Sequence, residues 1–281
     1  MELPGGWTLP ARAARTALTL GARIVGRADL GYALPDFLLI GAMKAGTSTL
    51  IAELAAHPHV IRARRREIHF FGSRYDRGVA WYRTHFPTGY ELRRYSAITG
   101  EGSTSYLANE ESPARIRAVL PGAKLIALLR DPVDRAISNY FHELRTGRET
   151  LPIEAAFAAE AERLSEAPRP TREGQSSLAY RRRGLYAEQL ARYQALFPPE
   201  QLLVLRSETL FTDPAAVVDR VCRFLGVDPG LAARTYAPKN LGGYDPSRVP
   251  PALYEDLTRF YAPHNERLYA MVGEDWGWRR P

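Results

Sequence analysis

A lysine set among small residues marks the first stretch that could do chemistry, Gly41-Ala42-Met43-Lys44-Ala45-Gly46-Thr47-Ser48-Thr49. It directly follows the apolar run Phe37-Leu38-Leu39-Ile40. Small residues let the backbone turn tightly, so that N–H groups of the turn and of a following helix converge where the helix dipole is positive. The pattern predicts a phosphate-binding loop formed by Lys44, Ala45, Gly46, Thr47, Ser48 and Thr49. The alternative is an ordinary strand-to-helix turn that uses glycine.

Lys44 stands out because lysine is rare in this chain. Of the 38 basic residues, only Lys44, Lys124 and Lys239 are lysines, and the other 35 are arginines. A compact ammonium group on a flexible stem can follow a negative charge that moves during a reaction. The loop is not a Walker A motif, because Lys44 precedes Gly46 by two positions where that motif has Gly-Lys-Ser/Thr in series.

A second candidate for phosphate binding follows the apolar run 124–129. Arg130 at the end of that run offers a planar fork for a phosphate dianion, and Ser138 lies two helical turns further on, where its hydroxyl can donate to the same group. We therefore predict that Arg130 and Ser138 bind one phosphate. Arg135 and Asn139 neighbour Ser138 on the expected helix and either assist it or face solvent.

Both junctions resemble the nucleotide-binding motifs of sulfotransferases that use 3′-phosphoadenosine 5′-phosphosulfate (PAPS). Residues 41–49 look like the family's 5′-phosphosulfate loop, and residues 128–140 look like its 3′-phosphate motif. Further segments run in the same order as in the heparan sulfate sulfotransferase branch and its bacterial relatives: 67–71, 81–82, 100–106, 184–198 and 210–226. The resemblance implies PAPS as donor, no metal, and an α/β fold of the P-loop-like, three-layer type with a central parallel sheet flanked by helices.

The resemblance also assigns two residues beside the acceptor. In that branch the glutamate of the Glu-x-His-Phe-Phe segment is the catalytic base, which carries over to Glu67, and His69 carries over as a second polar group. Apart from the resemblance, a carboxylate flanked by apolar Ile68 and Phe70 is expected to have a raised pKa, as a base near neutral pH requires. The alternatives are that Glu67 pairs with an arginine of 64–66 and that His69 is a core residue.

Two glycines depart from the heparan sulfate branch. Gly102 stands where those enzymes have lysine, and Gly72 stands where they have aspartate, which weakens the case for an acidic glycosaminoglycan acceptor. Near the C-terminus, Lys239 and Gly242 are predicted to close over the nucleotide, with Arg248 competing for the phosphate role of Lys239. Carbohydrates, glycolipids and secondary metabolites all remain candidate acceptors, and Tyr75, Trp81, Tyr82 and Tyr106 either line the acceptor site or belong to the core.

Periodicity predicts alternating strands and helices. Strands are expected at 37–40, 97–99, 124–129 and 202–205, and helices from about 47 to 57 with a hydroxyl cap, and at 132–146, 184–197, 213–225 and 251–271. Such alternation is typical of a parallel sheet covered on both faces. We expect an N-terminal arm over 1–35 and one sulfotransferase domain over 36–281, with a lid-like insertion near 150–183.

Composition bounds the remaining classes. The chain has 281 residues, of which 45% are hydrophobic, a net charge of +7 and the single cysteine Cys222. An arginine-rich genome explains the basic balance without a nucleic-acid partner, and one cysteine, expected in the core, fits a reducing cytoplasm. No spanning helix is predicted; the segment 11–27 either lies on an anionic membrane as an amphipathic helix or packs on the domain. The sequence does not predict an oligomeric state.

The sequence therefore favours transfer of a sulfuryl group from PAPS to an acceptor hydroxyl. Lys44 would stabilise charge on the bridging oxygen of the donor, and Glu67 would accept the hydroxyl proton. Two other classes stay open. One is a P-loop phosphotransferase such as a kinase, and the other is a catalytically silent module that binds a nucleotide or polyanion.

Overall fold

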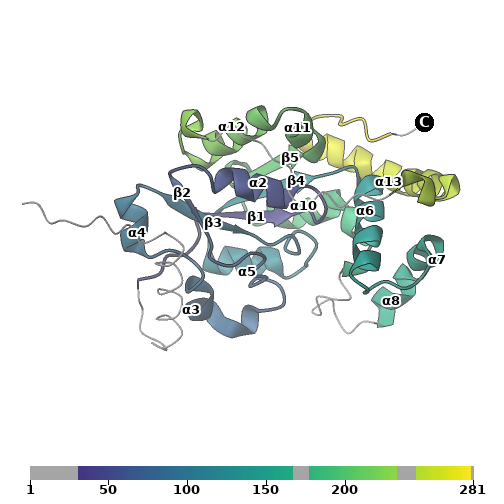
Figure 1. The fold of residues 1–281 in the computed structure, drawn as a ribbon, viewed down its shortest axis with the longest axis horizontal. Coiled ribbons are helices and arrows are strands. Elements are labelled where there is room, and N and C mark those ends of the chain that lie inside the picture. Colours follow the sequence, from purple (N-terminus) through teal and green to yellow (C-terminus); the bar gives the residue numbers. More distant parts are fainter. Residues whose placement is uncertain (1–30, 167–176, 233–244, 280–281) are drawn as a thin grey trace, which may run out of the picture.

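A computed structural model describes residues 31–166, 177–232 and 245–279. Within them, parallel strands form one sheet in the order β2-β3-β1-β4-β5 (Figure 1). The strands are β1 (Phe37–Gly41), β2 (Val60–Arg62), β3 (Ile98–Gly102), β4 (Lys124–Leu129) and β5 (Leu202–Arg206). β1 is buried along its whole length, as expected for a continuous apolar run at the centre of a parallel sheet.

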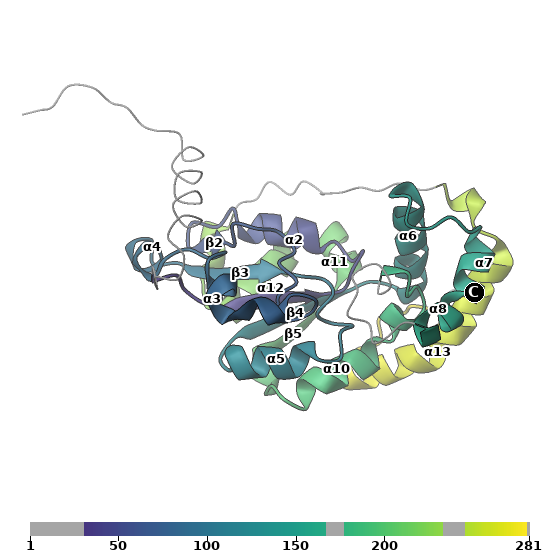
Figure 2. The ribbon, with the colours of Figure 1, turned by 90° about the horizontal axis from the view of Figure 1, so that it is seen from below.

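Helices cover both faces of the sheet. Figure 2 shows α2 and α11 on one face, and α5 and α10 on the other. The helices around the sheet are α2 (Thr47–Leu54), α3 (Gly78–Arg83), α4 (Gly89–Arg94), α5 (Ser112–Val119), α10 (Tyr186–Gln194), α11 (Ser207–Thr212) and α12 (Pro214–Leu225). The predicted three-layer α/β fold with a central parallel sheet is confirmed.

A second, smaller core lies beside the carboxyl end of β4. It joins α6 (Pro132–Arg145), α7 (Ile153–Ala158) and α13 (Pro251–Val272) through Ile137, Phe157 and Leu257. The helix α8 (Glu160–Glu166) follows α7, and both belong to the predicted insertion near 150–183. In both views α6, α7, α8 and α13 lie together at one end of the sheet (Figures 1 and 2).

The long apolar segments form the expected strands and helices, whereas several short elements were not predicted from the sequence. β4 and α6 lie where the apolar run and the Asp-Pro pair predict, and Asp131 caps α6 by accepting hydrogen bonds from the N–H groups of Val133 and Asp134. The short strand β2 was not predicted, nor were α3, α4, α5 and α11, because three to eight residues carry too little periodicity. Cys222 is buried in the core, as expected.

Several predictions fall outside the described residues. These are the N-terminal arm up to residue 30, part of the insertion, and the loop residues Lys239 and Gly242. Within the described parts, no helix combines the length and apolar character needed to cross a bilayer. The same parts of the chain contain no cluster of three or more metal-ligating side chains.

Candidate active site

The loop between β1 and α2 bends through two left-handed residues, Lys44 (φ 70°) and Gly46 (φ 89°). Gly46 is the N-cap of α2, and no side chain caps this helix, so the expected hydroxyl cap at 47–49 is wrong. A left-handed cap without a side chain suits this position, because a Cβ at Gly46 would lie 2.9 Å from the ring of Phe211. The hydroxyls of Thr47 and Ser48 instead lie in the first turn, beside the N–H groups of the helix end.

Two residues that directly follow β5 and β4 hold this loop by its carbonyl groups. Ser207 at the start of α11 donates its hydroxyl to the Ala45 carbonyl at 2.6 Å, and Arg130 at the end of β4 donates to the Lys44 carbonyl at 3.2 Å. The structure therefore brings Lys44 and Arg130 together, although 86 positions separate them in the chain. Fixed carbonyls leave the amide side of the loop free to face an anion.

Lys44 lies in a positive environment. Its pKa is lowered, chiefly because burial removes water from the ammonium group and also because Arg145 and Arg130 repel its charge, while Glu143 opposes the shift. Positive side chains that lie this close together repel one another, and a bound anion reduces this repulsion. This concentration of positive charge at the loop favours a polyanionic ligand.

The helix α6 buries more of its polar side than the sequence suggests. Ser138 is 8% exposed, and the side chains of Arg135 and Asn139 are fully buried. Arg135 donates to the Tyr180 carbonyl, and Asn139 donates to the Ser177 carbonyl at 2.6 Å. The solvent-facing alternative for Arg135 and Asn139 is therefore wrong, because the segment 177–180 covers this face.

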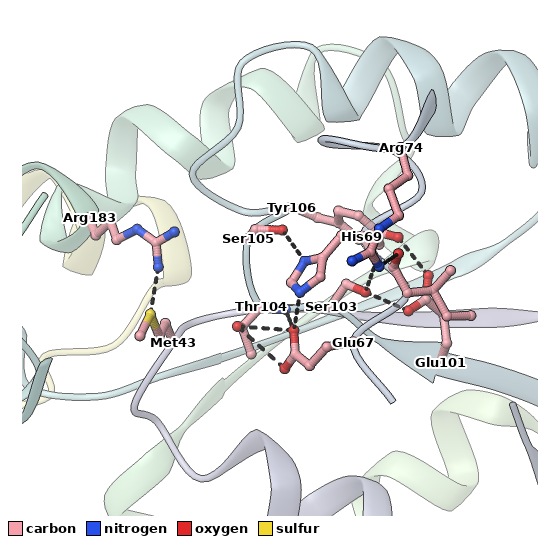
Figure 3. Close-up of polar contacts among 11 residues, drawn as sticks. Met43, Glu67, His69, Arg74, Glu101, Ser103, Thr104, Ser105, Tyr106 and Arg183 are labelled. Carbon is pink, nitrogen blue, oxygen red and sulfur yellow. Dashed lines mark hydrogen bonds and ion pairs between the residues drawn. The ribbon is translucent and has the colours of Figure 1, made fainter. Parts of the chain in front are cut away.

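Glu67 and His69 meet the end of β3 at the centre of Figure 3. The Glu67 carboxylate accepts a hydrogen bond from the Thr104 N–H at 3.1 Å, and His69 Nε2 lies 3.5 Å from Glu67 Oε2. The other imidazole nitrogen, Nδ1, is 2.9 Å from the Ser105 hydroxyl oxygen. His69 is thus a half-buried polar residue joined to Glu67, rather than an isolated core residue.

The environment of Glu67 suits proton transfer. Burial raises its pKa to about 7, repulsion by Glu101 adds to the shift, and the Thr104 hydrogen bond and the positive charge of Arg183 oppose it. The alternative pairing with 64–66 is wrong within the described residues, where Arg64 pairs with Glu91 instead and Glu67 pairs with none of the three. A carboxylate with such a pKa is half ionised near neutral pH, as a general base requires.

A cleft connects Glu67 to the start of α2. Its walls come from α2, from the segment after β2 and from the end of β3, with the lining residues Thr47, Ser48, Ile51, Arg62, Ala63, Arg65, Arg66, Glu67, Gly100, Glu101 and Gly102. Arg62, Arg65 and Arg66 are exposed, and their side chains make no hydrogen bond or ion pair with any described residue. The cleft therefore places unneutralised positive charge next to the Glu67 carboxylate.

Three residues at the site were missed as site residues in the sequence. Thr104 anchors Glu67, Glu101 is a buried carboxylate near it, and Arg183 donates to the sulfur of Met43, in the loop between β1 and α2, at 2.7 Å (Figure 3). Glu101 could have been found as a carboxylate inside a strand. Arg183 could have been found by its position directly before Gly184. Of the aromatic candidates, Tyr82 and Tyr106 are fully buried, in agreement with the core alternative.

Comparisons with known proteins decide the family. The model of the sulfotransferase domain family matches residues 34–235, which is more than half of the chain. The chain belongs to the sulfotransferase domain family. A crystal structure of a sulfotransferase from Alicyclobacillus acidocaldarius is similar over 88% of this chain and 100% of that one, with a TM-score of 0.68 and 34% identity.

Curated relatives of this sulfotransferase act on heparan sulfate. Human heparan sulfate glucosamine 3-O-sulfotransferase 6 is 36% identical over 265 residues, which cover 87% of this chain and 73% of the relative. Human bifunctional heparan sulfate N-deacetylase/N-sulfotransferase 3 is 36% identical over 206 residues, 70% of this chain and 23% of that protein. The chain is accordingly a PAPS-dependent sulfotransferase rather than a phosphotransferase.

Proposed function

We propose that this sulfotransferase transfers the sulfuryl group of PAPS to a hydroxyl of an anionic carbohydrate, with Glu67 as general base. The observation that carries the proposal is one cleft that holds both the Glu67 carboxylate and the start of α2, with the pKa of Glu67 raised to about 7. The heparan sulfate acceptors named for the relatives support a carbohydrate. The exposed arginines of the same cleft support an anionic one.

The sheet order separates donor from acceptor. β4 and β5 lie on one side of β1, and β3 and β2 lie on the other. Arg130 and Ser138 follow β4, so we place the 3′-phosphate of PAPS there and its 5′-phosphosulfate on the loop from Lys44 to Thr49. The cleft with Glu67 lies on the β3 and β2 side. An acceptor in that cleft approaches the sulfur from the face opposite the leaving phosphate, as in-line transfer requires.

The reaction balances with these residues alone. The acceptor hydroxyl oxygen forms a bond to sulfur while the bond between sulfur and the bridging phosphate oxygen breaks, releasing 3′-phosphoadenosine 5′-phosphate (PAP). The hydroxyl proton passes to Glu67, and the bridging oxygen keeps the electron pair. The Lys44 ammonium stabilises the charge that appears there, and His69 is the second polar group beside the acceptor.

Lys239 and Gly242 stay predicted residues of the nucleotide loop, and a cytoplasmic location stays a prediction.

A transfer assay with charge-matched acceptors tests the proposal. The enzyme is incubated with radiolabelled PAPS and pairs of oligosaccharides that differ only in carboxylate or sulfate groups, such as heparosan fragments before and after reduction of their carboxylates. We expect the label in the anionic member of each pair. Tight binding of PAP with no transfer to any carbohydrate, lipid or small alcohol would favour the silent-module alternative.

Arg130→Ala is expected to weaken PAP binding by about 10- to 100-fold. A charged hydrogen-bonding group at a phosphate contributes roughly 1.5–3 kcal/mol, and about 1.4 kcal/mol corresponds to tenfold in affinity. Calorimetric titration with PAP measures the effect. Arg223→Ala on the outer surface of α12 is the matched control, and equal affinities of the two variants would remove Arg130 from the donor site.

The paired change Arg65→Ser and Arg66→Ser is expected to raise KM for an anionic acceptor by about 3- to 10-fold. Each exposed charge pair contributes roughly 0.2–1 kcal/mol, and salt screens it. KM measured at rising salt should therefore converge for the variant and the wild type. Arg94→Ser, on α4, is the control, and a neutral acceptor should respond to neither change. The same loss with a neutral acceptor would contradict an anion-binding cleft.

A further inference from the structure

A buried carboxylate lies close enough to the proposed base to repel its charge. Glu101 on β3 is only 2% exposed, although burial of a carboxylate is costly unless hydrogen bonds replace its water. Three hydroxyl groups donate to it: Tyr82 at 3.1 Å, Tyr106 at 2.7 Å and Ser103 at 2.6 Å. The reaction as described above uses none of these groups, so this arrangement calls for another role.

The carboxylate also holds the backbone that carries Glu67 and His69. The Ile68 N–H donates to Glu101 directly. The His69 N–H donates to the Ser103 hydroxyl at 3.0 Å, and that hydroxyl in turn donates to Glu101 (Figure 3). Two consecutive peptide groups of this turn are therefore held by Glu101, that of Ile68 directly and that of His69 through the Ser103 hydroxyl. Arg74 anchors the same turn from its other side, by donating to the Ile68 carbonyl at 2.7 Å.

The turn needs such an anchor because its backbone is strained. Glu67 has φ of 48° and His69 has φ of 56°, and neither is a glycine. A left-handed conformation costs a residue with a Cβ roughly 1–2 kcal/mol and persists only where its surroundings enforce it. Release of the Ile68 and His69 amides would let the turn relax and would move the Glu67 carboxylate away from the Thr104 N–H.

We propose that Glu101 is a positioning residue, whose buried carboxylate keeps the 67–69 turn in its left-handed conformation and so aims Glu67 at the acceptor hydroxyl. The proposal rests on the proposed role of Glu67 as base. Burial raises the pKa of Glu101 itself, and the hydrogen bonds from Ser103, Tyr106, Tyr82 and Ile68 oppose that shift. In its ionised form Glu101 also helps to raise the pKa of Glu67. The other charged or titratable groups that face Glu67 are His69 on its own turn, Arg183, and Arg62, Arg65 and Arg66 in the cleft.

The variant Glu101→Gln keeps the shape of the side chain but removes its charge and one acceptor oxygen. We expect kcat to fall about 10- to 100-fold, because a displacement of about 1 Å at a reacting group costs on the order of 10²-fold. PAP affinity should not change, since Ser207 and Arg130, and not Glu101, hold the loop from Lys44 to Thr49. A general loss of folding would lower both quantities together.

An NMR titration measures the effect of Glu101 on the pKa of Glu67 and needs no acceptor. Glutamate carboxyl carbons are isotope-labelled in the PAP complex, and the Glu67 signal is assigned by its absence from Glu67→Gln. We expect the Glu67 titration to move to lower pH in Glu101→Gln, because a repelling charge is gone, and to stay close to wild type in Glu101→Asp. Glu200→Gln, at an exposed position, serves as control and should leave the titration unchanged.

The outcomes separate the two proposals. Wild-type kcat and an unmoved Glu67 titration in Glu101→Gln would overturn the role of Glu101 while leaving Glu67 as the base. Full activity of Glu67→Gln would instead overturn the base itself. If Glu101→Gln does not fold, Ser103→Ala replaces it. This variant keeps the Glu101 carboxylate but removes its link to the His69 N–H and one of its three hydroxyl donors. It should lower kcat with PAP affinity intact, and unchanged kcat would count against the proposal.

Discussion

Lys44→Ala is expected to lower kcat by at least ~100-fold, the scale on which a major electrostatic stabiliser of a transition state acts. The Lys44 carbonyl accepts a hydrogen bond from Arg130, and the positive charge of Arg130 is close enough to lower the pKa of the Lys44 ammonium group. In the proposed mechanism this ammonium group stabilises the negative charge that the leaving phosphate gains as the bond to sulfur breaks. KM for PAPS should change less than kcat, because that charge develops only in the transition state. Single-turnover transfer of label from bound PAPS measures the chemical step.

The matched variant for this position is Lys44→Arg. It keeps the charge but replaces a compact ammonium group by a planar guanidinium group. Compared with Lys44→Ala, we therefore expect Lys44→Arg to recover most of the PAP affinity but less of kcat. Lys124→Ala controls for the loss of a lysine elsewhere. Lys124 is the first residue of β4, and its ammonium group donates to the Phe224 carbonyl of α12 and lies 5.5 Å from the centre of the Phe224 ring. Near-normal turnover of Lys44→Ala would exclude Lys44 from the mechanism.

Glu67→Gln is expected to lower kcat by about 10²- to 10⁴-fold, the range for loss of a general base. The sign of the pH dependence follows from the raised pKa: Glu67 accepts a proton only when ionised, so wild-type kcat/KM should fall as pH drops below about 7. That acid limb should be absent from the residual rate of Glu67→Gln. Rates measured from pH 5 to pH 9 test the point.

Stability gives an independent check on the same variant. A carboxyl group with a raised pKa binds its proton more tightly in the folded state, so its contribution to stability is lost as pH rises from its unfolded pKa through about 7. Above pH 7 the ionised Glu67 therefore weakens the fold. Glu67→Gln should unfold at the same or a higher temperature than wild type at pH 8. A clear loss of stability there would contradict the raised pKa.

The sequence predicted the elements that are long and apolar, and the residues attached to their ends. β1 and β4 are continuous apolar runs, and Lys44 and Arg130 follow them directly, so their meeting at one sheet edge could be inferred from the parallel arrangement. Glu67 has no such support from a regular element. Its assignment came from the resemblance, and the structure adds its neighbours Thr104 and His69.

The rest depended on contacts between distant segments. Glu101 collects hydroxyls from Tyr82 and Tyr106, and nothing in the spacing of these residues reveals that they share one carboxylate. The sequence left open whether the face of α6 with Arg135 and Asn139 is solvated, because the segment that covers it lies about 40 positions later. Hydrophobic patterns record which side of an element is apolar, but they do not record which buried polar groups will satisfy one another.

The most direct test of the central claim is a single-turnover experiment with the wild type and Glu67→Gln, both loaded with radiolabelled PAPS and mixed with an anionic oligosaccharide. Both proteins should bind PAP equally, since the proposal places Glu67 on the acceptor side of the site. We predict rapid transfer of label to the oligosaccharide by the wild type and at least ~100-fold slower transfer by Glu67→Gln. Equal rates, or no transfer by the wild type to any anionic oligosaccharide, would contradict the account.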